Sequence, residues 1–244
     1  MEWGPTGAAA VAADIAVVID VLSFTTTVGI AVERGLRVLP FAWRDERAAS
    51  YAEARDAVLA VGRLEARSLD GDHSHGISLS PAAMAAADLA GVGQVVLPSP
   101  NGSTIAFGLA ATGAQVVAAS LRNASAVALH VAALMRDGAT CAVIPAGERW
   151  PDESLRPCVE DLWGAGAVIA GLVDRGVTGL GPEARVAEQA FRAVRASIAT
   201  ELAACAGGVE LAAAGYADDV EVAGRLDVSQ VVPVLVGDAF VSAS

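Results

Sequence analysis

The sequence predicts a three-layer α/β fold, in which helices cover both faces of a mostly parallel sheet. Short runs rich in Val, Ile and Leu alternate along the chain with Ala-rich stretches of helical composition, which is the pattern of repeated β-α units. The first run, residues 15–22, is apolar at every position but one, as expected of a buried strand. With 244 residues and 54% hydrophobic residues, the chain can bury a sizeable core.

The individual elements follow from this alternation. The predicted strands cover residues 15–22, 36–41, 94–97, 115–119 and 140–145. The predicted helices cover residues 25–34, 45–58, 103–111, 124–136 and 159–175. Residues 62–81, which include His73 and His75, are expected to form an exposed loop, residues 182–205 are helical, and residues 231–236 are an apolar segment. Because no repeat or linker is evident, a single domain over residues 1–244 is predicted.

Composition excludes several classes of function. The formal net charge of −12 repels nucleic acid and anionic membranes, so neither is an expected partner. All basic residues are Arg, and the absence of Lys excludes a Walker A loop and a Schiff-base lysine. The cysteines Cys141, Cys158 and Cys205 have no motif spacing. Without a secretory signal or a long apolar run, a cytoplasmic location is expected, and the Ala-rich composition is compatible with a homo-oligomer.

Polar residues follow four of the predicted strands, at the edge where open parallel sheets bind their ligands. The first group is Asp20 with Thr25, Thr26 and Thr27, where a strand leads directly into a helix. A helix N-terminus offers N–H groups and partial positive charge to a phosphate, and Thr hydroxyls add uncharged donors. The alternative is that one Thr simply caps the helix.

Two further groups are rich in Asn. Gly102 lets the backbone approach a ligand, and its neighbours Asn101 and Ser103 can donate hydrogen bonds or cap a helix. Asn123 opens another predicted helix, beside Arg122, which can bind an oxyanion or form a surface ion pair. Each group alone is explained by ordinary turns and caps, and their convergence on one edge favours a ligand site.

The fourth group is acidic and holds five carboxylates within residues 148–161. Acidic residues favour the first turn of a helix on electrostatic grounds alone, which is one explanation for Glu160 and Asp161. The other is cation binding, since Mg²⁺ takes a few carboxylates together with water and phosphate oxygens. We therefore consider Asp20, Glu160 and Asp161 as metal ligands and catalytic residues, with Arg149 stabilising charge during phosphoryl transfer.

Five blocks that occur in order over nearly the whole chain resemble the 2-phosphosulfolactate phosphatase family. The blocks are residues 17–27, 100–104, 120–128, 146–166 and 215–233. The resemblance implies a Mg²⁺-dependent phosphatase acting on a small phosphorylated sulfo-acid in coenzyme M biosynthesis. Ser23 stands where the family usually has Arg, and Trp163 stands where a Cys is expected.

The residues and the resemblance together lead to one main hypothesis: 2-phosphosulfolactate, or a similar small phosphorylated acid, reacts with water to give sulfolactate and phosphate. The residues expected to hold the phosphate are Thr25, Thr26, Thr27, Asn101, Gly102, Ser103 and Asn123. Asp20 is also considered as a nucleophile that forms an acyl phosphate. The departures at Ser23 and Trp163 motivate an alternative, a non-catalytic protein that binds a phosphorylated ligand. A haloacid-dehalogenase-type hydrolase is disfavoured, because Asp20-Val-Leu lacks a second Asp and the chain has no Lys.

Overall fold

The computed structural model describes residues 1–42, 46–60 and 77–243. Its main sheet has eight strands in the order β3-β4-β2-β10-β9-β5-β1-β6, and β7 and β8 form a separate pair. The strands are β1 (Ile15–Ile19), β2 (Arg37–Phe41), β3 (Val58–Leu59), β4 (Gln94–Pro98), β5 (Gln115–Ala119), β6 (Cys141–Pro145), β7 (Glu148–Arg149), β8 (Leu155–Arg156), β9 (Pro233–Val236) and β10 (Ala239–Ser242). The predicted α/β class with a mostly parallel sheet is confirmed.

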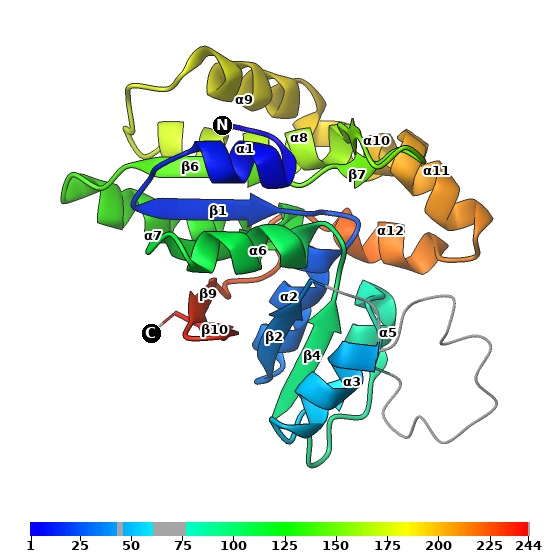
Figure 1. Ribbon diagram of the computed structural model, residues 1–244. Helices are drawn as coiled ribbons and strands as arrows, with labels where there is room; N and C mark the ends of the chain where they lie inside the picture. Colours follow the sequence, from blue (N-terminus) through cyan, green and yellow to red (C-terminus); the bar gives the residue numbers. More distant parts are fainter. Residues whose placement is uncertain (43–45, 61–76, 244) are drawn as a thin grey trace.

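Two groups of parallel strands make up the main sheet. β3, β4 and β2 form one group, and β5, β1 and β6 form the other. The C-terminal hairpin β9–β10 lies between them and pairs antiparallel with β5 on one side and with β2 on the other. Figure 1 shows this hairpin in red between β1 and β2. The sequence indicated an apolar segment here but not the second strand of the hairpin.

Helices cover both faces of the sheet. They are α1 (Gly4–Ala10), α2 (Phe24–Glu33), α3 (Glu46–Glu53), α5 (Pro81–Ala86), α6 (Gly102–Ala110), α7 (Ala124–Arg136), α8 (Val159–Val173), α9 (Pro182–Val194), α10 (Ile198–Ala204), α11 (Ala206–Ala213) and α12 (Ala217–Ala223), with 3₁₀ turns η1 (Leu121–Asn123) and η2 (Arg195–Ser197). No single helix in the described ranges is long and apolar enough to cross a bilayer; only α9–α10 and α11 together, with a 44° bend between them, reach that length and composition.

Burial on both faces explains why β1 is apolar throughout. Ile15, Val17 and Ile19 pack in the same core cluster as α7 and α8. Ala16 and Val18 belong to the cluster formed with α2 and α6 on the opposite face. A polar side chain at any of these positions would be buried without water, so the strand shows no polar alternation.

Several predicted boundaries are wrong, for local reasons. The first strand ends at Ile19 rather than residue 22, because the chain turns at Asp20 into α2. The predicted helix over residues 45–58 is shorter, and Val58–Leu59 forms β3. The short elements α1, β7 and β8 span too few residues to show a period in the sequence. Pro81 begins α5, and His73 and His75 lie outside the described residues.

Candidate active site

Asp20 lies directly after β1 and holds two backbone amides. Its Oδ1 accepts a hydrogen bond from the Phe24 amide, and its Oδ2 accepts one from the Gly102 amide, each at 3.1 Å. The first contact closes the turn into α2, and the second joins the first residue of α6 to that turn. A Cβ on residue 102 would lie 2.8 Å from Asp20 Oδ2 and 2.9 Å from Phe24 Cγ, so only glycine fits here.

Asp161 lies in the first turn of α8 and joins the ends of two parallel strands. Its Oδ1 accepts from the Val21 amide after β1, and its Oδ2 accepts from the Gly147 amide after β6, each at 2.8 Å. Burial raises the pKa of Asp161 well above its usual 3.8, and the charges of Asp20 and Glu160 raise it further. The two aspartates are therefore close together and buried at the carboxyl edge of the sheet, where their negative charges repel each other.

Glu160 is buried beside Asp161 but faces a different element. Its Oε2 lies 3.4 Å from the Cys205 thiol, at the start of α11. A Cβ on Gly207 would lie 3.2 Å from Glu160 Cδ, so the carboxylate rests on the first turn of that helix. Burial raises the pKa of Glu160.

The donor set suits a hard cation held by few protein ligands. Within the described ranges, no group of three or more His, Cys, Asp or Glu side chains is arranged to hold a metal, so Asp20, Glu160 and Asp161 do not form one cage. Each carboxylate oxygen of Asp20 and Asp161 accepts one backbone N–H, which orients both side chains at the ends of the strands. Mg²⁺ is commonly bound through one or two carboxylates, with water and substrate phosphate completing its shell. A cation here would offset the repulsion between the two aspartates.

The three threonines of α2 are fully buried, and their hydroxyls donate to backbone carbonyls. Thr25 donates to Asp20 O, Thr26 to Val21 O and Thr27 to Leu79 O, at 2.7 to 2.8 Å. In this arrangement the hydroxyl protons fix the turn and the neighbouring loop rather than point toward a ligand. Phosphate binding by these residues stays a prediction.

The other phosphate-binding candidates differ in how their side chains are engaged. Ser103 donates to Leu97 O at 2.9 Å, and Asn123 donates to Val231 O at 3.0 Å while accepting from the Ser120 amide. Asn101 is buried at the N-cap of α6, and its side-chain amide makes no hydrogen bond to any described residue. Asn101 is thus the candidate with an uncommitted polar side chain next to Gly102.

The two candidate arginines bind other partners and not the two aspartates. Arg149 is partly exposed and pairs with Glu153 at 3.1 Å. Arg122 donates to Val222 O at 3.2 Å and lies 3.7 Å from Glu33, the last residue of α2, so it reaches the end of that helix opposite Asp20. Burial lowers the pKa of Arg122.

Sequence reasoning missed the backbone groups that complete the site. The amides of Val21 and Gly147 hold Asp161, and Gly207 packs against Glu160. The signal for Gly147 was its place directly after a strand, before the acidic segment, but a backbone amide leaves no residue-type signature. The pair Gly207-Gly208 follows the helix predicted over residues 182–205, and nothing in the sequence indicated that it lies in a further helix, α11.

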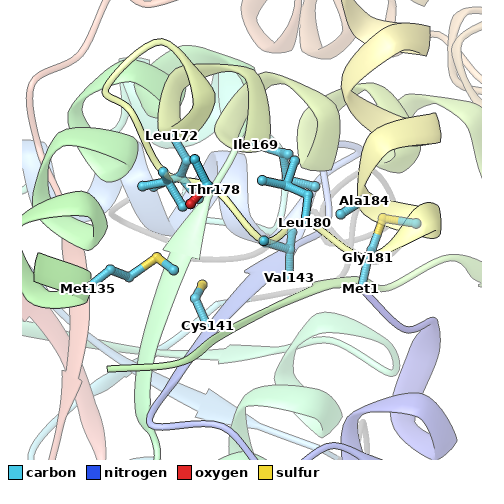
Figure 2. A pocket seen from close by; sticks show the side chains of 12 residues that line it. Met1, Met135, Cys141, Val143, Ile169, Leu172, Thr178, Leu180, Gly181 and Ala184 are labelled. Atoms are coloured by element: carbon cyan, nitrogen blue, oxygen red, sulfur yellow. The ribbon is translucent and has the colours of Figure 1, made fainter. Parts of the chain in front are cut away.

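A separate cavity of about 120 Å³ lies at the other end of β6 (Figure 2). Apolar side chains such as Met135, Ile169 and Leu172 line it, together with Cys141, the first residue of β6. Burial raises the pKa of the Cys141 thiol to about 12. Because Gly147 follows the opposite end of that strand, this cavity is remote from the aspartates.

Fold and site together define a three-layer α/β protein with buried aspartates at the carboxyl ends of its parallel strands. A family model described as 2-phosphosulpholactate phosphatase matches residues 6–238. A protein from Deinococcus radiodurans, described as a probable 2-phosphosulfolactate phosphatase, is 30% identical over 223 residues, which cover 91% of this chain and 88% of the relative. The chain belongs to the 2-phosphosulpholactate phosphatase family, which confirms the resemblance seen in the sequence.

Proposed function

We propose that the protein is a Mg²⁺-dependent phosphatase that hydrolyses 2-phosphosulfolactate or a closely similar phosphorylated acid to sulfolactate and phosphate. Family membership supports the phosphatase activity. The observation that carries the proposal is the pair of buried aspartates, Asp20 and Asp161, held by four backbone amides where the parallel strands end. This is the place where an open parallel sheet binds its ligand.

Asp20 and Asp161 are the residues that would hold Mg²⁺. The ion would neutralise charge on the phosphoryl oxygens and bring them to the aspartates. The protein fixes both carboxylates in advance, because each already accepts two backbone N–H groups, and those of Gly102 and Val21 come from 82 and 140 residues away in the sequence. Such preorganisation is the main requirement of phosphoryl transfer, whose barrier is lowered by positioning and electrostatics.

The phosphoryl group would lie against the start of α6. Asn101 offers an amide that no described residue engages, and the helix N-terminus adds partial positive charge. Hydrolysis breaks the phosphorus–oxygen bond to the substrate carbon skeleton, and the attacking water supplies the new oxygen of inorganic phosphate. In the variant of this proposal with Asp20 as nucleophile, a carboxylate oxygen attacks first and water then cleaves the acyl phosphate.

The proposal is tested by measuring phosphate release from small phosphoesters, including 2-phosphosulfolactate and phosphoglycolate, with Mg²⁺ and with chelator. We expect turnover of the sulfonated substrate that chelator abolishes and added Mg²⁺ restores. Phosphate release that is unaffected by chelator would contradict the Mg²⁺ dependence. Thermal stabilisation by these compounds without phosphate release from any would instead support the non-catalytic binding protein.

A further inference from the structure

One face of α11 contacts two segments next to the aspartates, the first turn of α8 and the β7–β8 hairpin, which together are called the rim of the candidate site. Gly207 and Glu210 are three residues apart on this helix and therefore lie on the same face. Gly207 packs against the Glu160 carboxylate, and Glu210 pairs with Arg156. Figure 1 shows α11 near β7, and the contact of Gly207 with Glu160 brings α11 against the first turn of α8, although it is far from both in the sequence.

The first contact seats Glu160 on the amino end of α11. An added Cβ at Gly207 would lie 3.2 Å from Glu160 Cδ and would overlap Oε1 outright. The Cys205 thiol lies 3.4 Å from Oε2 and also caps the helix by accepting from the Gly208 amide. A buried carboxylate at a helix N-terminus is favoured by the exposed N–H groups and their partial positive charge.

The second contact reaches Asp161 through the β7–β8 hairpin. Arg156 binds Glu210 through two hydrogen bonds, at 2.7 and 3.1 Å, and its guanidinium lies 4.9 Å from the centre of the Trp150 ring. The carbonyl of Arg156 packs so closely on Gly147 that a Cβ there would lie 2.8 Å away. The Gly147 amide is one of the two that hold Asp161.

We infer that α11 is the support of the site rim, and that Glu160 is a positioning residue which acts through this helix. The carboxylate of Glu160 fixes the first turn of α8, which carries Asp161, while Glu210 fixes the hairpin that supplies the Gly147 amide. The lack of any cluster of three potential metal ligands among the described residues agrees with a Glu160 carboxylate directed at α11. The catalytic consequence rests on the proposed phosphatase function; the contact between Glu160 and α11 does not.

The catalytic consequence is tested with Gly207→Ala and a matched control, Gly108→Ala. Both replace a helical glycine, but a Cβ at Gly108 would meet no atom within 4 Å. Gly207→Ala should lower kcat/KM about 10- to 100-fold, as expected when the support of a site ligand is displaced. Gly108→Ala should leave kcat/KM within about twofold of wild type. Equal activity of both variants would overturn the inference.

The contact itself is tested without turnover, using Glu160→Gln. Hydrogen exchange of the α11 amides should accelerate about tenfold in this variant, because the helix loses its buried counter-charge. Binding of Mg²⁺ alone, measured by calorimetry, should weaken by a similar factor in Glu160→Gln and in Gly207→Ala, since both changes act on the site through α11. Unchanged exchange in α11 would show that Glu160 does not support this helix, and Mg²⁺ binding weakened about tenfold more in Glu160→Gln than in Gly207→Ala would show that Glu160 is a ligand; either result would overturn the inference.

The cysteine gives a conservative rescue. Cys205→Ser keeps a donor to Glu160 and is a strong N-cap, so it should match the wild-type exchange of α11. Cys205→Ala removes both interactions and should raise that exchange toward the level of Glu160→Gln. A serine variant that exchanges as fast as the alanine variant would contradict the inference. If the wild-type protein releases no phosphate, these exchange measurements still decide whether α11 supports Glu160.

Discussion

The close packing of Gly102 against the turn between β1 and α2 predicts that Gly102→Ala is strongly destabilised. In Gly102→Ala, the new Cβ would lie 2.8 Å from Asp20 Oδ2 and 2.9 Å from Phe24 Cγ. Displacing Asp20 would cost a hydrogen bond to a charged group, about 1.5–3 kcal/mol, and overpacking against Phe24 would cost about 1–3 kcal/mol. Replacing glycine within a helix returns about 1 kcal/mol.

These contributions sum to a loss of about 1.5–5 kcal/mol, or roughly 3–20 °C in Tm for a chain of this size. Thermal unfolding of Gly102→Ala and of Gly108→Ala, a change in the same helix with open space around it, measures the difference directly. Gly108→Ala should be as stable as wild type or about 1 kcal/mol more stable. Phe24→Ala removes the ring that the new Cβ would meet. The double variant Phe24→Ala/Gly102→Ala should therefore lose less unfolding free energy than the sum of the losses in the two single variants. A Gly102→Ala protein that unfolds at the wild-type temperature would refute this account of the turn.

Three further predictions concern the charged and polar groups. Without divalent cations, the free energy of unfolding should rise as the pH falls from mildly alkaline to mildly acidic. Burial raises the pKa of Asp161 in the folded state, so in this range the folded protein binds protons that the unfolded chain does not. Urea unfolding should show that the free energy of unfolding depends less on pH in Asp161→Asn than in wild type. Asn101→Ala should raise KM about tenfold and change the free energy of unfolding by less than about 0.5 kcal/mol, since the side-chain amide of Asn101 engages no described residue. An unchanged KM in steady-state kinetics with 2-phosphosulfolactate would contradict this prediction. Arg122→Met should lose about 1–3 kcal/mol of stability and keep kcat, because its partners Glu33 and Val222 lie away from the aspartates; a large fall in kcat would place Arg122 in the reaction.

The sequence predicted best those elements that are long and bounded by clear signals. Residues 115–119 and 124–136 were predicted with the observed bounds of β5 and α7. β5 is apolar at every position after Gln115, and α7 follows it after the polar residue Asn123 at its N-cap. The hairpins β7–β8 and β9–β10 could not be predicted in the same way, because strands of two to four residues show no period.

The site was predictable in its carboxylates but not in what holds them. Asp20, Glu160 and Asp161 stood out because acidic residues occurred at a strand end and at a helix start. Their partners are mostly backbone amides brought from far along the chain, such as Val21 for Asp161, 140 residues away. Sequence alone also could not decide how the Thr hydroxyls are used. The same residues suit phosphate binding and local bonding to carbonyls, and the structure shows the latter for Thr25 and Thr26.

The central claim is that Asp20 and Asp161 form the centre of a Mg²⁺-dependent phosphatase, and variants of α8 test it most directly. Phosphate release from 2-phosphosulfolactate should be measured for wild type, Asp161→Asn and Asp174→Asn, each with Mg²⁺ and with chelator. Asp174 lies at the other end of the same helix, in a surface ion pair with Arg192. The account predicts chelator-sensitive turnover in wild type and Asp174→Asn, and a loss of about 100-fold or more in Asp161→Asn. Wild-type turnover by a folded Asp161→Asn protein would contradict it.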